Sequence, residues 1–231
     1  RKTSKLSRIS GILTKLKIHE VNLLEIDKLK GIVKKISPEI IFHLAAKSVY
    51  SSQKENSRQE IVKTNFLGTL NLTEALQDVD YQCLVNIGSS SEYGIKNHTV
   101  RESEVCQPVN TYGLSKLAAT LYCQMVGKMK KKPIVTLRLF SPFGPFDDQR
   151  RLIANIIVSV LKNRDLILTR PSIVRDYIFI EDVVDALLVC IDKSKKFSGE
   201  IFNIGSGKQH KVGEVVETII KLTNSKSGLL W

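Results

Sequence analysis

The feature that most constrains the fold is the alternation of short, β-prone apolar runs with longer segments of helical periodicity. The β-prone runs lie at residues 17–21, 39–44, 82–87, 134–139 and 200–204. Apolar residues recur at helical spacing in residues 26–36, 60–76, 112–129, 152–161, 181–191 and 212–222. Strands that alternate with amphipathic helices form parallel β-α-β units. The pattern therefore predicts an α/β fold built on a doubly wound parallel sheet.

Composition indicates a globular chain without a membrane span. Of the 231 residues, 42% are hydrophobic and 25% are charged, which is near the globular average. The longest apolar run, residues 152–161, falls well short of the ~20 residues that cross a bilayer, and no signal peptide opens the chain. We therefore expect no membrane partner.

The net charge of +12 is concentrated at the start of the chain, where the first 36 residues carry +7. The 25 lysines outnumber the 10 arginines, and no basic stripe is interleaved with aromatic residues. Helix-turn-helix and zinc-finger patterns are absent from the sequence. We interpret the charge as a solvated lysine-rich surface with no nucleic-acid partner, which would also suit a phosphate-bearing small ligand.

The four cysteines, Cys83, Cys106, Cys123 and Cys190, are widely spaced and form no C-x-x-C pair. This spacing argues against a zinc site, so we expect no metal, and it provides no disulfide framework. A reducing, cytoplasmic location is the simplest interpretation.

Ligands of open α/β sheets bind beyond the carboxyl ends of the strands. The residues that directly follow three of the predicted strands are Ala45-Ala46-Lys47-Ser48, Gly88-Ser89-Ser90-Ser91 and Phe140-Ser141-Pro142. Small residues follow two of these strands, so a ligand could approach the backbone closely there.

One pair in the chain has the chemistry of a proton-transfer site. Tyr112 and Lys116 are four residues apart at the start of a predicted helix, so their side chains share a face. An ammonium beside a phenol favours the phenolate, which makes tyrosine usable as a general acid or base. The same spacing recurs at Tyr50 and Lys54, but that pair lies in a polar loop and is interpreted as surface.

Seven motifs occur in order along almost the whole chain, at residues 43–46, 65–72, 88–94, 112–116, 137–145, 175–186 and 202–207. Through them the chain resembles the NAD-dependent epimerase/dehydratase family, extended short-chain dehydrogenases/reductases that act on nucleotide sugars. The resemblance implies a Rossmann-like NAD(P)-binding domain over residues 1–140. Residues 141–231 would form mostly a small C-terminal substrate lobe, with residues 175–192 returning to the first domain.

The resemblance also implies that the chain is truncated at both ends. The first strand and the Gly-x-x-Gly-x-x-Gly turn that cradles a pyrophosphate do not precede Arg1. We therefore expect the chain as given to bind a dinucleotide poorly. The basic pair Arg1-Lys2 lies where such residues meet a 2′-phosphate, which favours NADP over NAD.

Family roles are assigned by position in the matching motifs. The catalytic set would be Ser89, which hydrogen-bonds the reacting sugar oxygen, Tyr112 as acid/base, and Lys116, which assists Tyr112 and holds the nicotinamide ribose. The cofactor would be lined by Tyr112, Lys116 and a further group: Arg1, Asn22, Leu23, Leu44, Ala45, Ala46, Lys47, Asn65 and Phe140. The substrate would contact Ser48, Ser90, Ser91, Ser141 and Arg175.

Several of these positions have a simpler structural interpretation. His43 is expected to be a core or supporting histidine, because the family does not use it catalytically. Ser90 and Ser91 could only cap a turn or fill space. Arg175 could form an ion pair with Asp176 or Asp182.

The shared family reaction is proton exchange at a sugar hydroxyl with hydride transfer to or from nicotinamide. We rank a nucleotide-sugar epimerase or 4-ketoreductase above a 4,6-dehydratase, because the dehydratase places its extra acid and base where this chain has Ser90 and Ser91, with Glu92 one position later. A non-catalytic nucleotide-binding protein on the same fold is the alternative from another class. The resemblance further implies a homodimer formed through helices 60–76 and 112–129.

Overall fold

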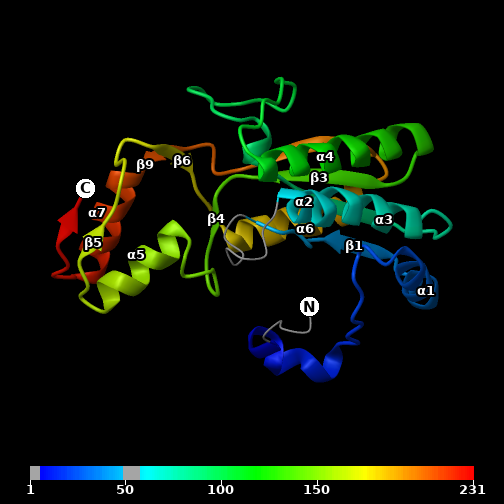
Figure 1. Cartoon of the computed structure of the whole chain (residues 1–231), viewed down its shortest axis with the longest axis horizontal. Helices are drawn as coiled ribbons and strands as arrows, with labels where there is room; N and C mark the ends of the chain where they lie inside the picture. The colour runs from blue at the N-terminus through cyan, green and yellow to red at the C-terminus, as the bar shows by residue number, and fades with distance from the viewer. Residues whose placement is uncertain (1–5, 49–57) are drawn as a thin grey trace. The chain divides into compact units, whose positions relative to one another are not determined.

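The first part of the fold is built around a four-stranded sheet. The computed structural model describes residues 6–48 and 58–231 (Figure 1). The sheet consists of β1 (Ile40–His43), β2 (Cys83–Ser89), β3 (Ile134–Leu139) and β8 (Ile201–Ile204), in the order β1-β2-β3-β8. β1 and β2 pair in parallel, with Ile40 opposite Cys83. The predicted α/β class is confirmed.

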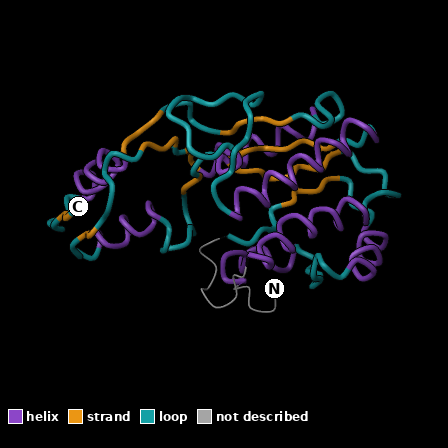
Figure 2. The backbone as a smooth tube through the Cα atoms, turned by 45° about the horizontal axis from the view of Figure 1, so that its top comes forward, coloured by secondary structure: helices purple, strands orange, loops and turns teal. Residues whose placement is uncertain are grey.

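Helices cover both faces of this sheet (Figure 2). One face packs against α1 (Ile26–Ile36), α3 (Gly68–Ala75) and α4 (Thr111–Lys130), in a core that includes Leu84 of β2. Because alternate side chains of a strand point to opposite faces, the neighbouring Cys83 points the other way. Its Sγ lies 3.4 Å from the carbonyl oxygen of Cys190, in α6 (Ile180–Lys193).

The segment between β1 and α3 contains a helix of two kinds. A short α2 (Arg58–Val62) runs directly into a π-helical turn, η2 (Lys63–Leu67), which continues into α3. π-helical turns widen a helix by one residue and recur at functional sites. The prediction of one helix over residues 60–76 identified this segment but not its π-helical turn.

The chain divides into two compact units. Unit 1 comprises Arg1–Arg138 and Leu187–Phe202, and unit 2 comprises Leu139–Ala186 and Asn203–Trp231. Unit 2 packs α5 (Leu152–Leu161) against α7 (Val212–Thr223) around the buried Ile156, Val160 and Val216. Three pairs of short strands belong to it: β4 (Pro142–Phe143) with β7 (Ile178–Phe179), β5 (Leu166–Ile167) with β10 (Leu229–Leu230), and β6 (Val174–Asp176) with β9 (Gln209–Lys211).

The predicted strand at residues 17–21 is wrong. After a 3₁₀ helix, η1 (Leu6–Lys15), these residues are irregular, and residues 17–20 are exposed. A strand is held by hydrogen bonds to a neighbouring strand, and the described sheet ends at β1 without a partner for this run. Local β propensity alone therefore does not order it.

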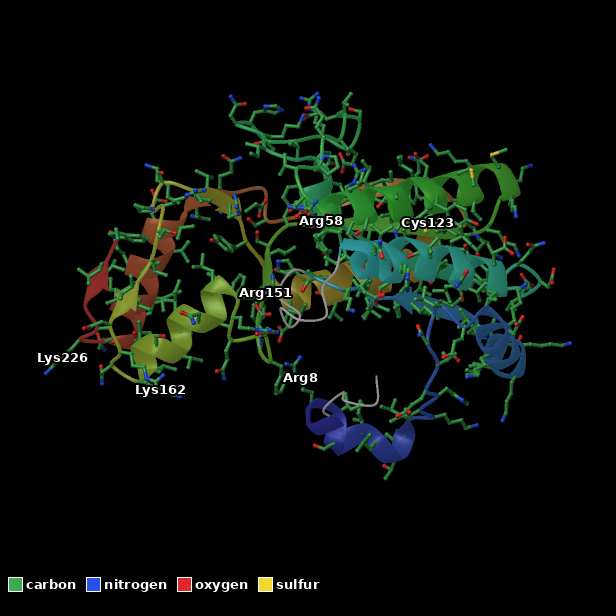
Figure 3. All side chains as sticks on the ribbon, viewed as in Figure 1. Arg8, Arg58, Cys123, Arg151, Lys162 and Lys226 are labelled. Carbon is green, nitrogen blue, oxygen red and sulfur yellow. The ribbon has the colours of Figure 1, made fainter. Side chains whose placement is uncertain are left out.

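The surface and the cysteines agree with the composition. Lys162 at the end of α5 and Lys226 before β10 are exposed and extend outward (Figure 3). All four cysteines are free, and Cys83, Cys123 and Cys190 are buried. Among the described residues, no helix is both long enough and apolar enough to span a membrane.

Candidate active site

The end of β2 turns sharply into a single 3₁₀ turn, η3 (Ser90–Glu92), that Ser89 caps. The Ser89 Oγ accepts a hydrogen bond from the Ser91 backbone N–H at 3.2 Å. In return, Glu92 Oε1 accepts the Ser89 backbone N–H at 2.8 Å. This reciprocal arrangement is a capping box, which satisfies backbone donors at both ends of the turn. It fixes the conformation of Ser89 at the carboxyl end of the sheet.

Glu92 is also half of a buried ion pair. Its side chain is fully buried, and its Oε2 lies 2.7 Å from the Nε of Arg138, which is 3% exposed. Thr120 of α4 donates to Glu92 Oε1 at 3.0 Å, and Arg138 Nη1 donates to the Tyr93 hydroxyl at 2.8 Å. The Glu92 carboxylate thus connects η3, α4 and β3. A buried charge with this many partners fixes the geometry around it.

The start of α4 carries the tyrosine–lysine pair. Asn110 caps the helix, its Oδ1 accepting the Gly113 N–H at 2.8 Å. Tyr112 is half-buried in the first turn, and Lys116 lies one turn further on, 2% exposed. A Cβ at Gly113 would collide with the backbone carbonyl of Ser91. Only glycine allows α4 and η3 to approach this closely, so the serine turn and the tyrosine helix are in direct contact.

The electrostatic environment of Lys116 is mixed. Burial lowers the pKa of its ammonium group, while the negative charges of Glu92 and, to a lesser extent, Cys123 raise it. Cys123 lies on the same helix (Figure 3), and burial raises the pKa of its thiol to about 12, so the thiol is neutral at physiological pH. Of the two acidic groups that raise the pKa of Lys116, the Glu92 carboxylate, paired with Arg138, is the larger influence.

His43, at the end of β1, is a buried neutral histidine. Its Nε2 lies 2.8 Å from the Oγ1 of Thr69, which itself donates its one hydrogen to the Asn65 carbonyl at 2.7 Å. The Thr69 oxygen can therefore only accept from His43, so Nε2 carries the imidazole proton. Burial, followed by the nearby charge of Lys116, lowers the pKa of His43 to about 4. The expectation of a supporting core histidine agrees with this environment.

Asn65 holds the loop after β1 against α4. It is fully buried in the π-helical turn η2, where its Oδ1 accepts the Lys47 N–H at 2.7 Å and its Nδ2 donates to the Lys47 carbonyl at 3.0 Å. The same Nδ2 donates to Ser115 Oγ at 2.9 Å, and Ser115 Oγ donates to the Tyr112 carbonyl at 2.8 Å. One amide side chain thus links the backbone at Lys47 to the turn that carries Tyr112.

The stretch after β1 remains open. Leu44, Ala45 and Ala46 are exposed, Leu44 by 61%, whereas Lys47 and Ser48 are half-buried. An exposed apolar stretch with small side chains at the end of a parallel strand can accept a flat ligand. Asn65 links this stretch to the tyrosine helix, and Gly113 brings that helix against the serine turn.

Asn22 and Leu23 precede α1 and have different environments. The exposed Asn22 accepts the Leu24 N–H through its own Oδ1 at 3.1 Å, which closes a local turn. Leu23 packs against the core of unit 1, and its carbonyl accepts from Asn71 Nδ2 at 2.8 Å. Arg1 and the pair Tyr50 and Lys54 lie outside the described residues.

The remaining predicted positions belong to unit 2. Phe140 is half-buried, and its backbone N–H donates to the Ile204 carbonyl at 2.9 Å. Ser141 follows with a positive φ of 31°, an unusual backbone conformation for serine. The exposed Arg175 lies in β6, opposite His210 of β9.

The alternative interpretation of Arg175 is an ion pair with a neighbouring aspartate. None of the ion pairs among the described residues involves Arg175, so the expected pairing with Asp176 or Asp182 is not observed. Asp176 instead accepts the backbone N–H groups of Ser206 at 2.8 Å and Gly207 at 3.0 Å. Its carboxylate thereby orders the turn between β8 and β9.

The sequence did not predict the ion pair between Glu92 and Arg138. The signal was present, because Ser89 and Glu92 form the S-x-x-E pattern of a capping box. The partner arginine, 46 positions away, carries no local signal of this pairing.

Comparisons of the sequence and the structure with known proteins all point to one family. The sequence model of the NAD dependent epimerase/dehydratase family matches residues 1–205. The chain is 31% identical over 227 residues to a UDP-glucose 4-epimerase of Mycoplasma pneumoniae, covering 87% of this chain and 66% of that protein. It is 24% identical over 237 residues to a dTDP-D-glucose 4,6-dehydratase of Dictyostelium discoideum, covering 95% and 54%.

A solved structure of a UDP-glucuronic acid 4-epimerase from Bacillus cereus, in complex with UDP-glucuronic acid and NAD, superposes with a TM-score of 0.84 at 25% identity. The match covers 97% of this chain and 70% of that one. The chain thus spans about two thirds or less of the two curated relatives named above.

Proposed function

Because the chain belongs to the NAD dependent epimerase/dehydratase family, we propose that the full-length protein is a nucleotide-sugar 4-epimerase or 4-ketoreductase. Its reaction would combine nicotinamide hydride transfer with proton exchange at a sugar hydroxyl. The observation that carries this proposal is the direct contact of the Ser89 turn with the helix of Tyr112 and Lys116, through Gly113 and Glu92.

Each member of the proposed catalytic set has a distinct task. Tyr112 would exchange the proton of the reacting sugar hydroxyl, and Lys116 one turn away would stabilise the phenolate. The Ser89 hydroxyl accepts from the Ser91 N–H, which leaves its own hydrogen to donate to the sugar oxygen. Holding these groups in place lowers the entropic part of the barrier.

The residues around the opening after β1 fit a dinucleotide. The exposed small side chains of Ala45 and Ala46 leave room beside the strand end, and Asn65 fixes Lys47 on both backbone atoms. Leu44, Asn22, Leu23 and Phe140 would complete the cofactor contacts, with NAD or NADP as the bound form. The nicotinamide ring supplies hydride exchange with the sugar when it is bound. The B. cereus relative, solved in complex with NAD, supports this assignment.

The nucleotide-sugar substrate would contact Ser48, Ser90, Ser91, Ser141 and Arg175. Arg175 is exposed, and none of the ion pairs among the described residues involves it. A guanidinium of this kind binds diphosphate well, because its donors match phosphate oxygens in pairs.

A 4,6-dehydratase is the second candidate, supported by the likeness to the D. discoideum enzyme. Eliminating water requires an additional acid and base. Ser90 and Ser91 provide no carboxylate at the expected positions, and the neighbouring Glu92 is buried in its ion pair with Arg138. These observations favour epimerisation or reduction over elimination.

We further propose a homodimer formed through helices 60–76 and 112–129. The outward face of α4 carries Leu114, Leu121, Met125 and Met129, which are 45% to 78% exposed. An apolar stripe of this kind on a long helix is typical of a helix-pairing surface. A cytoplasmic location stays a prediction from the unpaired cysteines.

The experiment that tests the function is a panel of nucleotide sugars incubated with the full-length protein and NAD or NADPH in D₂O. NMR of the products separates the outcomes. A 4-epimerase interconverts UDP-glucose and its 4-epimer without placing solvent deuterium on carbon. A 4,6-dehydratase gives a deoxy-keto product that carries deuterium, because a carbon-bound proton is exchanged during elimination. Absence of turnover with every sugar, while nucleotide binding persists, would contradict the proposal and indicate a non-catalytic binding protein.

A further inference from the structure

The buried ion pair of Glu92 and Arg138 lies directly against a proposed catalytic residue, because the Glu92 carboxylate accepts the backbone N–H of Ser89. Of the two Glu92 oxygens, Oε1 accepts the Ser89 backbone N–H and the Thr120 hydroxyl, while Oε2 faces Arg138 Nε. The side chain is 0% exposed. Placing a carboxylate there is costly unless every lone pair has a donor, and here Ser89 supplies one of the donors.

The surrounding backbone is shaped to admit this carboxylate. A Cβ at Gly88 would lie 2.7 Å from Glu92 Oε1 and 3.0 Å from Arg138 Cγ. Any side chain at position 88 would therefore displace one of the two charged groups. Gly88, the residue before Ser89 in β2, thus keeps space for the carboxylate that accepts the Ser89 N–H.

The same carboxylate also acts on the site lysine. Titratable groups near Lys116 include Glu92 from η3, His43 from β1, and Tyr112 and Cys123 from α4. His43 and Cys123 are held neutral near pH 7 by burial. The Glu92 carboxylate raises the pKa of the Lys116 ammonium group, which burial lowers.

We propose that Glu92, with Arg138 as its counter-ion, is a positioning residue of the catalytic set, which fixes Ser89 through its backbone amide. The inference rests on the proposed function and assigns Glu92 a task other than elimination chemistry. It explains why a carboxylate one position beyond the dehydratase position is buried rather than directed at substrate.

Two double variants separate the charge of Glu92 from its hydrogen bonds. Glu92→Gln alone would leave the Arg138 guanidinium buried without a counter-charge, which is strongly destabilising. Both variants therefore carry Arg138→Met. Glu92→Gln with Arg138→Met removes the charge but retains an oxygen that can accept the Ser89 N–H. Glu92→Leu with Arg138→Met removes both.

The matched control is Ser194→Ala. Ser194 is fully buried in unit 1, and its hydroxyl donates to the Gln82 carbonyl at 2.7 Å, just before β2 begins. This substitution removes a buried hydrogen bond without touching the catalytic set. It reports what a loss of stability alone does to activity.

The measurements are kcat and KM across pH in the full-length protein, together with the NMR chemical shift of the Ser89 backbone amide. Both double variants remove the Glu92–Arg138 ion pair as a whole, so they differ only in whether an acceptor for the Ser89 N–H remains. We expect kcat to fall further in the leucine variant, by up to about 100-fold, since misplacing a reacting group costs that much.

The outcomes distinguish the inference from the proposed function. If the glutamine and leucine variants lose kcat equally, or if their activity loss only follows the fraction of folded protein as in Ser194→Ala, Glu92 is architectural and the inference is wrong. If the wild-type protein turns over no nucleotide sugar while the Ser89 amide signal moves further in the leucine variant than in the glutamine variant, the proposed function fails but the positioning of Ser89 by Glu92 stands.

Discussion

Individual side chains at this site are held by hydrogen bonds whose direction can be assigned. Thr69 donates to the Asn65 carbonyl and therefore accepts from His43, while Ser115 donates to the Tyr112 carbonyl and therefore accepts from Asn65. The first series of hydrogen bonds starts at His43 of β1, and the second starts at Asn65 of η2. Because each hydroxyl has one hydrogen, His43 must carry a proton on Nε2, and its lowered pKa of about 4 keeps the imidazole neutral near pH 7. The protonation state of His43 is thus coupled to the packing of the helices that carry Asn65 and Lys116.

Stability should depend on pH through His43. Its pKa is about 4 in the folded chain and 6.5 in the unfolded chain, so the unfolded state binds the extra proton between these values. The free energy of unfolding should therefore be unaffected above pH 6.5 and fall as the pH drops toward 4, by about 3 kcal/mol in total.

Urea unfolding between pH 4 and 7.5 checks this expectation against His43→Asn, which cannot titrate in that range. The wild-type protein should lose more stability on acidification than the variant does. Equal pH dependence of the two proteins would mean that folding does not lower the pKa of His43.

Substitution of a single glycine tests the direct contact between η3 and α4. Gly113→Ala should destabilise the protein by about 1–3 kcal/mol, because the added methyl group meets the Ser91 carbonyl and must push the two elements apart. Gly31→Ala in α1 is the matched control, since its added methyl group would meet no atom within 4 Å beyond its chain neighbours and the backbone of its own helix. It should stabilise by about 0.5–1 kcal/mol, as alanine is the better helix former.

Thermal unfolding of both variants measures the difference. Activity of the full-length protein should fall in Gly113→Ala and persist in Gly31→Ala. A neutral effect of Gly113→Ala on both stability and activity would contradict the direct contact between the serine turn and the tyrosine helix.

The helix α4 carries apolar residues on two faces. Its buried face includes Cys123 and Val126, which pack in the core of unit 1, together with Ser115 and Lys116. Leu121 and Met125 on its outer face are 50% and 45% exposed. A helix with apolar residues on both faces can pack against its own domain and against a second surface.

The outer face can be tested by charge substitution. Leu121→Glu with Met125→Glu should convert the proposed dimer to monomer, because two carboxylates from each subunit would be buried without partners. Sedimentation at several concentrations measures the oligomeric state, with Leu188→Glu on α6, which is also 52% exposed, as the control. A variant that sediments as the wild type does would place the subunit contact elsewhere or exclude it.

The elements that the sequence predicted well are the helices with strong periodicity. Residues 26–36 and 152–161 form α1 and α5 with the predicted bounds. The run at 17–21 failed because strand formation depends on a partner that no local pattern reveals. The short strand pairs of unit 2, such as β5 with β10, were not predicted, because a strand of two residues shows no detectable alternation of apolar and polar residues.

The candidate site was likewise predictable only where it depends on local sequence patterns. Ser89, Tyr112 and Lys116 stand out because their residue types and spacing are local and chemically distinctive. The π-helical turn that orients Asn65 and the pairing of Glu92 with Arg138 were not predictable, since both depend on tertiary contacts over many residues. Local patterns identify the reacting groups, whereas the groups that hold them appear only in three dimensions.

Across the whole molecule, the proposed roles are divided between the two units. Ser89, Tyr112, Lys116 and the opening after β1 belong to unit 1, whereas Phe140, Ser141 and Arg175 belong to unit 2. This division predicts separable effects on kinetics. Arg175→Ala should raise KM for the nucleotide sugar with little change in kcat, because a diphosphate contact contributes equally to ground-state and transition-state binding. Steady-state kinetics check it, and a fall in kcat at unchanged KM would contradict the assignment.

Proton exchange by Tyr112 at the substrate hydroxyl is tested most directly by the turnover of Tyr112→Phe in the full-length protein. Tyr122→Phe, which removes a hydroxyl from the same helix, is its control. We expect Tyr112→Phe to lower kcat by about 10²–10⁴-fold while NAD(P) binding is retained, because only the proton-transferring group is lost. Turnover at the wild-type rate in Tyr112→Phe would mean that another group transfers the proton.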